Sequence, residues 1–413
     1  MGTTICANVP RRPFDPLLPT VCALGIAQIT AWGTSYYCLG VLARPIAAET
    51  GWSQSLIYFG FTVSLLVMGA VSTAAGRAID RHGARAVMAC GTVLVSIGLL
   101  LLSLARSEAG YLAVWALLGV GMRLSLYDAA FAALVQVVPS RGRRALSYLT
   151  MFGAFASTVF WVVGHQLNEA YGWRVTLACF AAINLLICLP LNWLGLSRRE
   201  APAAVGAPDA LSETIDGEPL QGRQRDLAIG LFALVMSLNG FVFGVVTVQL
   251  VPLLEAAALP TAAAVWLASL KGFGQFGGRL VEIVFGRRLR AITVARFATG
   301  ALPWSFVFLL LGAGNFHALL VFTLLMGASQ GVITIVRGAL PLALFGKAGY
   351  GAVLGLLATP ILIVNAAAPT LNALIVDSWG WDAAVSVLLG AAAASWLTME
   401  AMSRWYEHSR RNA

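Results

Sequence analysis

Long uncharged apolar stretches constrain this chain of 413 residues more than any other feature. Four of them, 54–76, 86–105, 145–168 and 227–254, contain no Asp, Glu, Lys or Arg. A bilayer core requires about 20 apolar residues per helical span, and a helix satisfies its backbone polar groups within the segment itself. Hydrophobic residues make up 59% of the chain and charged residues 11%, which excludes a soluble globule of ordinary composition. The sequence therefore predicts an all-α membrane protein.

Polar breaks between the apolar stretches divide the chain into twelve predicted transmembrane helices. We expect them at 17–45, 54–76, 84–105, 110–137, 145–168, 174–196, 227–254, 258–280, 291–313, 315–339, 349–376 and 383–405. The segment after the sixth helix is polar and rich in Pro, Gly and acidic residues, which is typical of a flexible linker. The predicted parts are an N-terminal tail (1–16), a six-helix bundle (17–196), the linker (197–225), a second six-helix bundle (226–405) and a C-terminal tail (406–413).

The basic residues predict the orientation in the membrane, because Lys and Arg are retained on the cytoplasmic side. One set of alternate segments holds Arg11, Arg12, Arg77, Arg81, Arg85, Arg141, Arg143, Arg144, Arg198, Arg199, Arg223, Arg225, Arg287, Arg288, Arg290, Lys347, Arg404, Arg410 and Arg411. The other set holds only Arg44, Arg106 and Arg174. We therefore expect both termini and the linker to be cytoplasmic. The first apolar run is longer than a signal-peptide core, so we expect it to be retained as the first helix.

Two short motifs recur in the two predicted bundles. Gly76–Asp80 (GRAID) after the second helix has a counterpart in Gly278–Glu282 (GRLVE) after the eighth. Gly172-Trp173 opens the sixth helix and Gly380-Trp381 opens the twelfth. These positions are expected for parallel repeats related by an axis along the membrane normal. The alternative is that Gly-Trp only marks interfacial turns, as Gly51-Trp52 does before the second helix.

The segment Gly76–Arg85 (GRAIDRHGAR) resembles the loop between helices two and three of the major facilitator superfamily. The resemblance covers the whole chain with its twelve predicted helices, and it implies two six-helix bundles around a central cavity that opens alternately to each side. A Gly lets helices approach closely, and Asp80 can face the positive N-terminus of a neighbouring helix. We therefore expect Asp80, Arg81 and Glu282 to take part in gating.

Other segments resemble a bacterial branch near the monocarboxylate and oxalate-formate porters. They are Ala31–Tyr37 (AWGTSYY), Leu126–Phe131 (LYDAAF) and Arg337–Pro341 (RGALP). This resemblance implies a multi-pass protein of the bacterial inner membrane. Drug antiporters of the superfamily usually carry a Gly-Pro pair in helix five, whereas 145–168 contains no proline. The sequence therefore disfavours drug efflux.

Charged residues inside the predicted spans are functional candidates, because each costs at least a few kcal/mol in the hydrocarbon region. Arg123 lies near the middle of the fourth span, Asp128 lies closer to the cytoplasm, and Lys271 lies in the cytoplasmic half of the eighth. Arg123 and Asp128 are separated by about 140° around an ideal helix, so we expect them on different faces. Asp128 could instead pair with Lys271, or carry a proton. Arg296 and Arg337 lie near cytoplasmic helix ends, where they can snorkel, and are expected to be structural.

Two cations that face one cavity could hold a carboxylate, Arg through its planar fork and Lys as a mobile point charge. We therefore predict that Arg123 and Lys271 bind the substrate. The alternative is that both pair with acids or carbonyls and lock helices together. The other predicted cavity residues are Gln28, Trp32 and Tyr36, which recur every four residues on one helix face, and Tyr127, Asn239, Gln330 and Asn365.

Several classes of function lack support in the sequence. No metal-ligand or nucleophile pattern and no Gly-rich phosphate loop after a strand is visible, so we expect no cofactor and no ATP-driven pump. The six cysteines give no disulfide framework. The basic excess has no accompanying aromatic surface, so we expect no nucleic-acid partner. The expected partners are a small-molecule substrate, the bilayer and protons, and the expected state is a monomer.

The leading hypothesis is a secondary active transporter, not an enzyme, that moves a small organic anion such as a monocarboxylate by alternating access, through symport or antiport. The alternative is an exporter of a neutral or cationic compound, such as a drug, vitamin or metalloid species, by proton antiport. A membrane sensor is disfavoured, because we expect no signalling domain in the short segment after Tyr406.

Overall fold

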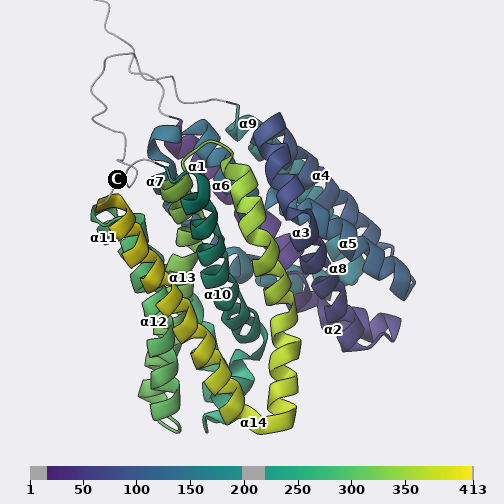
Figure 1. Ribbon diagram of the computed structural model, residues 1–413. Helices are drawn as coiled ribbons and strands as arrows, with labels where there is room; N and C mark the ends of the chain where they lie inside the picture. The colour runs from purple at the N-terminus through teal and green to yellow at the C-terminus, as the bar shows by residue number, and fades with distance from the viewer. Residues whose placement is uncertain (1–15, 198–218, 412–413) are drawn as a thin grey trace, which may run out of the picture.

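The computed structural model describes residues 16–197 and 219–411, and these residues form helices joined by short turns, with no strand among them (Figure 1). The first half contains α1 (Leu17–Ala31), a π-helical turn (Trp32–Tyr36), α2 (Leu39–Thr50), α3 (Gln54–His82), α4 (Ala84–Ser103), α5 (Glu108–Ser125), α6 (Tyr127–Val137), a 3-10 turn (Pro139–Arg141), α7 (Gly142–Gly153), α8 (Ala156–Ile183), a second π-helical turn (Asn184–Cys188) and α9 (Leu189–Gly195). The second half contains α10 (Gly222–Ala256), α11 (Thr261–Phe285), a 3-10 turn (Gly286–Arg288), α12 (Ala291–Leu311), α13 (Phe316–Phe345) and α14 (Tyr350–Arg411). The predicted all-α fold is confirmed.

Side-chain caps and glycines set several helix ends. Ser53 accepts a hydrogen bond from the backbone N–H of Leu56 at the start of α3, and Ser107 accepts one from Gly110 at the start of α5. Gly83 ends α3 with a φ of 82°, which L side chains rarely adopt, and α4 begins at the next residue. These signals let the chain reverse direction within a few residues.

Two long helices each contain a sharp turn at a glycine. Gly172 in α8 has φ 78° and ψ 165°, and Gly380 in α14 has φ 80° and ψ 176°. Gly51, the third glycine that precedes a tryptophan, has φ 73° and ψ 6° and ends α2. The Gly-Trp pairs at 172 and 380 therefore share a conformation that Gly51 lacks, as the two-repeat interpretation predicts.

Nine helical stretches of the described residues are long and apolar enough to span a membrane. One of them, Tyr350–Ser409, contains two helices on either side of Gly380. Another, Val159–Gly195, contains the end of the fifth predicted span and nearly all of the sixth, divided at Gly172. With these divisions, and with α11, whose polar residues lower its hydropathy, the helices follow the twelve predicted spans.

The two halves pack mainly within themselves and meet along two lines. Helices α3 and α14 lie side by side, and α7 lies against α11 and α13. We call the end where α9 stops and α10 starts the linker end; it is uppermost in Figure 1. One apolar core cluster joins the halves there, because it contains Ile79 and Phe131 of the first half and Leu342 and Leu354 of the second. This cluster lies between the linker end and the candidate site.

Candidate functional site

A cavity of about 170 Å³ lies between the two halves, and most of the predicted substrate-binding residues line it. They are Arg123, Trp32, Tyr36, Tyr127, Asn239, Gln330 and Asn365, and the predicted coupling residue Asp128 lines it as well. The lining also contains polar and aromatic residues that the sequence analysis did not assign to it: Tyr37, Gln275, Arg279 and Arg337. The cavity thus collects side chains from helices of both halves.

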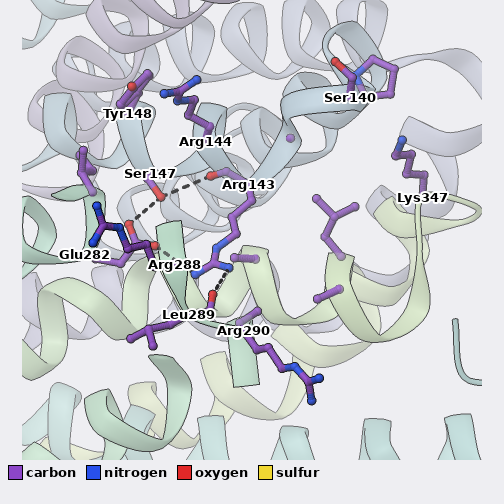
Figure 2. A pocket seen from close by; sticks show the side chains of 17 residues that line it. Ser140, Arg143, Arg144, Ser147, Tyr148, Glu282, Arg288, Leu289, Arg290 and Lys347 are labelled. Atoms are coloured by element: carbon purple, nitrogen blue, oxygen red, sulfur yellow. Dashed lines mark hydrogen bonds and ion pairs between the residues drawn. The ribbon is translucent and has the colours of Figure 1, made fainter. Parts of the chain in front are cut away.

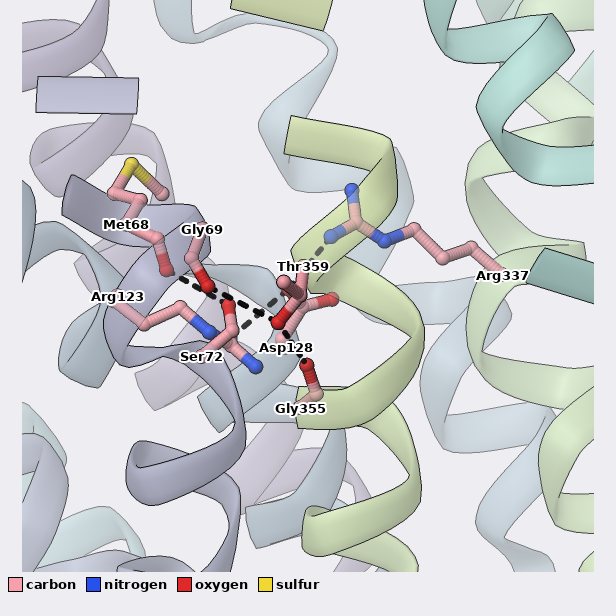
Figure 3. Close-up of polar contacts among 8 residues, drawn as sticks. All are labelled: Met68, Gly69, Ser72, Arg123, Asp128, Arg337, Gly355 and Thr359. Atoms are coloured by element: carbon pink, nitrogen blue, oxygen red, sulfur yellow. Dashed lines mark hydrogen bonds and ion pairs between the residues drawn. The ribbon is translucent and has the colours of Figure 1, made fainter. Parts of the chain in front are cut away.

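Arg123 and Asp128 form a buried ion pair at this cavity (Figure 3). Arg123 Nη1 lies 2.9 Å from Asp128 Oδ2, and the two side chains are 2% and 8% exposed. The prediction that they occupy different faces was wrong, because it assumed one continuous helix. The helix ends at Ser125, and Leu126 is extended (φ −83°, ψ −166°) before α6 begins. This break turns the chain so that Asp128 points back at Arg123.

Arg337 of the second half reaches the same carboxylate. Its Nη2 donates to Asp128 Oδ2 at 2.6 Å, so one oxygen atom accepts from a guanidinium of each half (Figure 3). Arg337 does not snorkel toward a helix end as expected; it lies in the cavity wall with its side chain 28% exposed. Proximity to a predicted helix end gave the wrong assignment because α13 continues to Phe345.

Arg279 is a second cavity residue that the sequence analysis missed. Its Nη1 donates to the backbone oxygen of Thr150 in the first half at 2.7 Å, and its Nε donates to Gly331 at 3.3 Å. Arg279 lies one residue before the end of the predicted eighth span, whereas α11 continues to Phe285 and keeps Arg279 buried within the bundle. An arginine in the repeated Gly-Arg motif was the available signal, but it was interpreted as part of a loop.

Lys271 does not line the cavity. It lies near the middle of α11. Its Nζ lies 5.4 Å from the ring centroid of Phe243, which does line the cavity. The conceivable pair with Asp128 is not formed, since Asp128 binds Arg123 and Arg337 instead.

Gln28 is also absent from the cavity wall, and it supports that wall from behind. Its Nε2 donates to the backbone oxygen of Ser125 at 2.7 Å, and its Oε1 accepts from Trp32 Nε1 at 3.2 Å. The Trp32 ring contacts Tyr36 and Tyr127, with centroid distances of 4.7 and 5.1 Å. Gln28 therefore holds both the end of α5 and the aromatic side of the cavity in place.

Several buried polar atoms of the lining have no hydrogen-bond partner among the described residues. They are Arg123 Nε, Asp128 Oδ1, Asn239 Oδ1 and Gln330 Nε2. A buried polar group without a partner typically costs about 1–3 kcal/mol, so a polar ligand that pairs with these atoms gains affinity. The arrangement suits a small solute with both donors and acceptors.

The predicted gating residues lie near the linker end, and two of them connect the halves. Asp80 accepts hydrogen bonds from the backbone N–H groups of Gly351 and Ala352 at the start of α14, at 3.0 and 2.7 Å. Glu282 accepts from Ser147 of α7 at 2.8 Å. Arg81 is exposed and makes no ion pair with a described residue. The contact of Asp80 with a helix N-terminus has the expected geometry; its role in gating stays a prediction.

The sequence profile of the Major Facilitator Superfamily matches residues 24–306, which is more than half of the chain. The chain belongs to the major facilitator superfamily. It is therefore a multi-pass membrane protein of a transporter superfamily, and not an enzyme.

Curated relatives within the superfamily match only part of this chain. The multidrug resistance protein MdtL of Escherichia coli O6:K15:H31 (strain 536 / UPEC) is 30% identical over 197 residues, which are 47% of this chain and 50% of MdtL. MdtL of strain O81 (ED1a) matches to the same extent. The chain thus spans about half the length of the curated relatives it matches.

Solved structures of transporters share the fold over nearly the whole chain. The human organic anion transporter MFSD10 (TETRAN) has a TM-score of 0.71 and 18% identity, covering 94% of this chain and 100% of that one. A bacterial homologue of the iron transporter ferroportin has a TM-score of 0.73 and 15% identity, covering 93% and 99%. The superfamily transporter FucP, in the outward conformation, has a TM-score of 0.69 and 14% identity, covering 94% and 99%. At these identities the likeness concerns the fold alone.

Proposed function

We propose that this member of the superfamily is a secondary transporter of a small organic anion, such as a monocarboxylate, and that the central cavity is its binding site. The observation that carries this proposal is the charge of the lining. The lining contains three arginines, Arg123, Arg279 and Arg337, and one carboxylate, Asp128. Because Asp128 can balance only one of these charges, the cavity attracts an anion.

Arg337 is the proposed carboxylate ligand. Arg123 is nearly inaccessible and points into its pair with Asp128, whereas Arg337 is more exposed and shares that carboxylate from the other half. A substrate carboxylate can take the place of Asp128 beside Arg337, whose planar guanidinium can bind both oxygens of a carboxylate although it contacts only Oδ2 of Asp128. Arg123 then acts mainly by holding Asp128. The sequence predicted Arg123 and Lys271 as the cations that bind the substrate, and this proposal assigns that role to Arg337 instead.

The proposed transport cycle rocks the two halves about this cavity. In the present conformation the halves are joined near the linker end, through Asp80 with α14 and Ser147 with Glu282. If the linker and both termini are cytoplasmic, as we propose from the arginine distribution, this conformation is closed toward the cytoplasm. Asp128 is the proposed proton carrier, because protonation would release Arg337 from the cross-half pair.

Matched acids and amides test the anion proposal. Purified protein is heated with lactate or benzoate and, separately, with lactamide or benzamide, which have similar shapes but no charge. An organic-anion transporter is expected to be stabilised by at least one acid and by neither amide. Arg337→Gln should abolish that stabilisation, whereas Lys271→Gln, which removes a cation outside the lining, should retain it. If the acid stabilised both variants equally, it would bind outside the central cavity.

Export of a neutral or cationic compound by proton antiport is the second candidate. Four aromatic side chains, Trp32, Tyr36, Tyr37 and Tyr127, gather on one side of the cavity, and rings of this kind attract cations and flat apolar compounds. The partial match to MdtL is consistent with this candidate. The same assay separates the two: a lipophilic cation such as ethidium that stabilises the wild type and the Arg337→Gln variant equally would favour export.

A further inference from the structure

A second cavity, of about 270 Å³, lies at the linker end and is separate from the central one. Its walls come from both halves: the 3-10 turn and the start of α7 on one side, and the turn between α11 and α12 with the end of α13 on the other (Figure 2). Neither the family match nor the proposed transport cycle assigns a ligand to it. The cavity exists only while the halves are together at this end.

The lining is strongly basic. It contains Arg143, Arg144, Arg288, Arg290 and Lys347. Its acidic residue is Glu282, which already accepts from Ser147 and lies 3.6 Å from Arg143. The cavity therefore holds an excess of positive charge that the described side chains around it do not neutralise.

One hydrogen-bond donor of Arg144 lacks an acceptor among the described residues. Its Nε is buried and has no hydrogen-bond partner among the described residues, although its guanidinium lies 5.9 Å from the Tyr148 ring. Arg290 and Lys347, on the opposite wall, are exposed and form no ion pair with a described residue. A buried guanidinium nitrogen without an acceptor is costly, so an anion bound in this cavity would be favoured.

The N-termini of two helices, one from each half, add to the positive electrostatic potential in this cavity. Helix α7, of 12 residues, begins at Gly142, and helix α12, of 21 residues, begins at Ala291. The side chain of the N-cap residue does not cap either helix, and both first residues line the cavity. The positive ends of two helices and several arginines around one space are the features by which proteins bind phosphate.

We propose that this cavity binds a phosphate group that bridges the two halves and stabilises the conformation closed at the linker end. Such a group can belong to the headgroup of an anionic phospholipid, since the cavity lies at the ends of helices that are long enough to span a membrane, or to a soluble phosphate ester. Because the anion contacts both halves, it must leave or lose half of its contacts when they separate. The ligand is thus a regulator of transport, whatever solute the central cavity carries.

The test measures thermal unfolding of the full chain in detergent with three probes: phosphatidylglycerol, phosphatidylcholine of the same acyl chains, and soluble glycerol 1-phosphate. Phosphatidylglycerol or glycerol phosphate, but not phosphatidylcholine, should raise the unfolding midpoint of the wild type. Arg144→Gln and Arg290→Gln should each weaken the apparent affinity about tenfold, since each removes one positive charge from the cavity lining. Arg290 is exposed, so its variant keeps the test informative if Arg144→Gln does not fold.

Arg223→Gln is the matched control, because Arg223 is an exposed arginine at the start of α10 outside the cavity. It should retain the wild-type response. A response to phosphatidylglycerol alone identifies a lipid headgroup as the source, and a response to glycerol phosphate at similar concentration identifies a soluble ester. The proposal is overturned if neither probe exceeds phosphatidylcholine, or if Arg223→Gln loses as much affinity as Arg290→Gln.

Discussion

The two lines along which the halves meet differ in what they are made of. Where α3 meets α14, which we call the glycine contact, backbone touches backbone: a Cβ placed on Gly76 would overlap the backbone oxygen of Gly351, and one on Gly355 would overlap that of Ser72. Where α7 and α6 meet α11 and α13, which we call the polar contact, side chains do the joining, as in Arg337 with Asp128.

This difference predicts different sensitivities. The glycine contact is made largely by backbone atoms, so it is sensitive to added volume and less sensitive to charge. The polar contact tolerates changes of shape, but it depends on which groups are charged and paired. During alternating access both must separate, and the polar contact is the one that a substrate or a proton can influence. The glycine contact is suited to act as a pivot.

The largest expected effect is at the polar contact. Replacing Asp128 by Ala leaves Arg123 buried without a counterion, and breaking a buried pair in this way costs about 3–5 kcal/mol of the free energy of unfolding. Thermal and denaturant unfolding of the purified protein measure this loss. The double variant Asp128→Ala with Arg123→Leu should recover part of it, because the uncompensated charge is gone. If the single and double variants were equally unstable, the pair would not be the cause.

A smaller loss is expected when a methyl group is added to the glycine contact. Gly76→Ala places a Cβ against the backbone of Gly351, and overpacking of this kind costs about 1–3 kcal/mol. Gly390→Ala is the matched control, because a Cβ at Gly390 in α14 meets open space. Unfolding midpoints of the two variants, measured side by side, should differ clearly. Similar midpoints would mean that α3 and α14 are not packed as described.

Exchange of Arg143 for Lys should have a still smaller effect. Arg143 donates to the backbone oxygens of Gly286 and Leu289, at 2.9 and 2.8 Å, and lies beside Glu282. Lysine keeps the charge but loses the planar fork, so we expect a loss of about 1 kcal/mol. Arg143→Gln, which also removes the charge, should lose more. Equal stability of the two variants would show that the fork, and not the charge, accounts for the loss.

The fold was predictable because its signals are local. Uncharged apolar stretches, glycines such as Gly172 and Gly380 and the polar linker each indicate a helix or a turn without knowledge of the partner helices. Most neutral cavity residues, such as Asn239 and Gln330, were also predictable, because a polar side chain inside a span must face other protein or a cavity. The resemblance to the superfamily then indicated which helices surround that cavity.

The charged part of the site was harder to predict, because it depends on where helices break and end. The break at Leu126 brings Asp128 to Arg123, although no Pro or Gly marks it in the sequence. The length of α11 decides that Arg279 lies inside the bundle and that Lys271 lies beyond the cavity. Small errors in helix boundaries therefore moved charges between the cavity and its surroundings.

The smallest effect is expected for Asp80, and its dependence on salt distinguishes an electrostatic contribution from a steric one. Asp80 lies at the edge of the glycine contact, where its carboxylate accepts from Gly351 and Ala352 at the N-terminus of α14. Because Asp80 is exposed, its charge is screened by salt, and Asp80→Asn should cost about 0.5–1 kcal/mol at low ionic strength. Asp226→Asn, at an exposed position in α10, controls for net charge.

Salt should reduce the difference between wild type and Asp80→Asn, whereas it should leave the effect of Gly76→Ala unchanged, since no charge is involved in the steric overlap. Unfolding midpoints across a salt series measure both. If the effect of Gly76→Ala decreased with salt in parallel, the contact between α3 and α14 would depend on Asp80 and not on the glycines. The distinction between a steric pivot and an electrostatic contact would then fail.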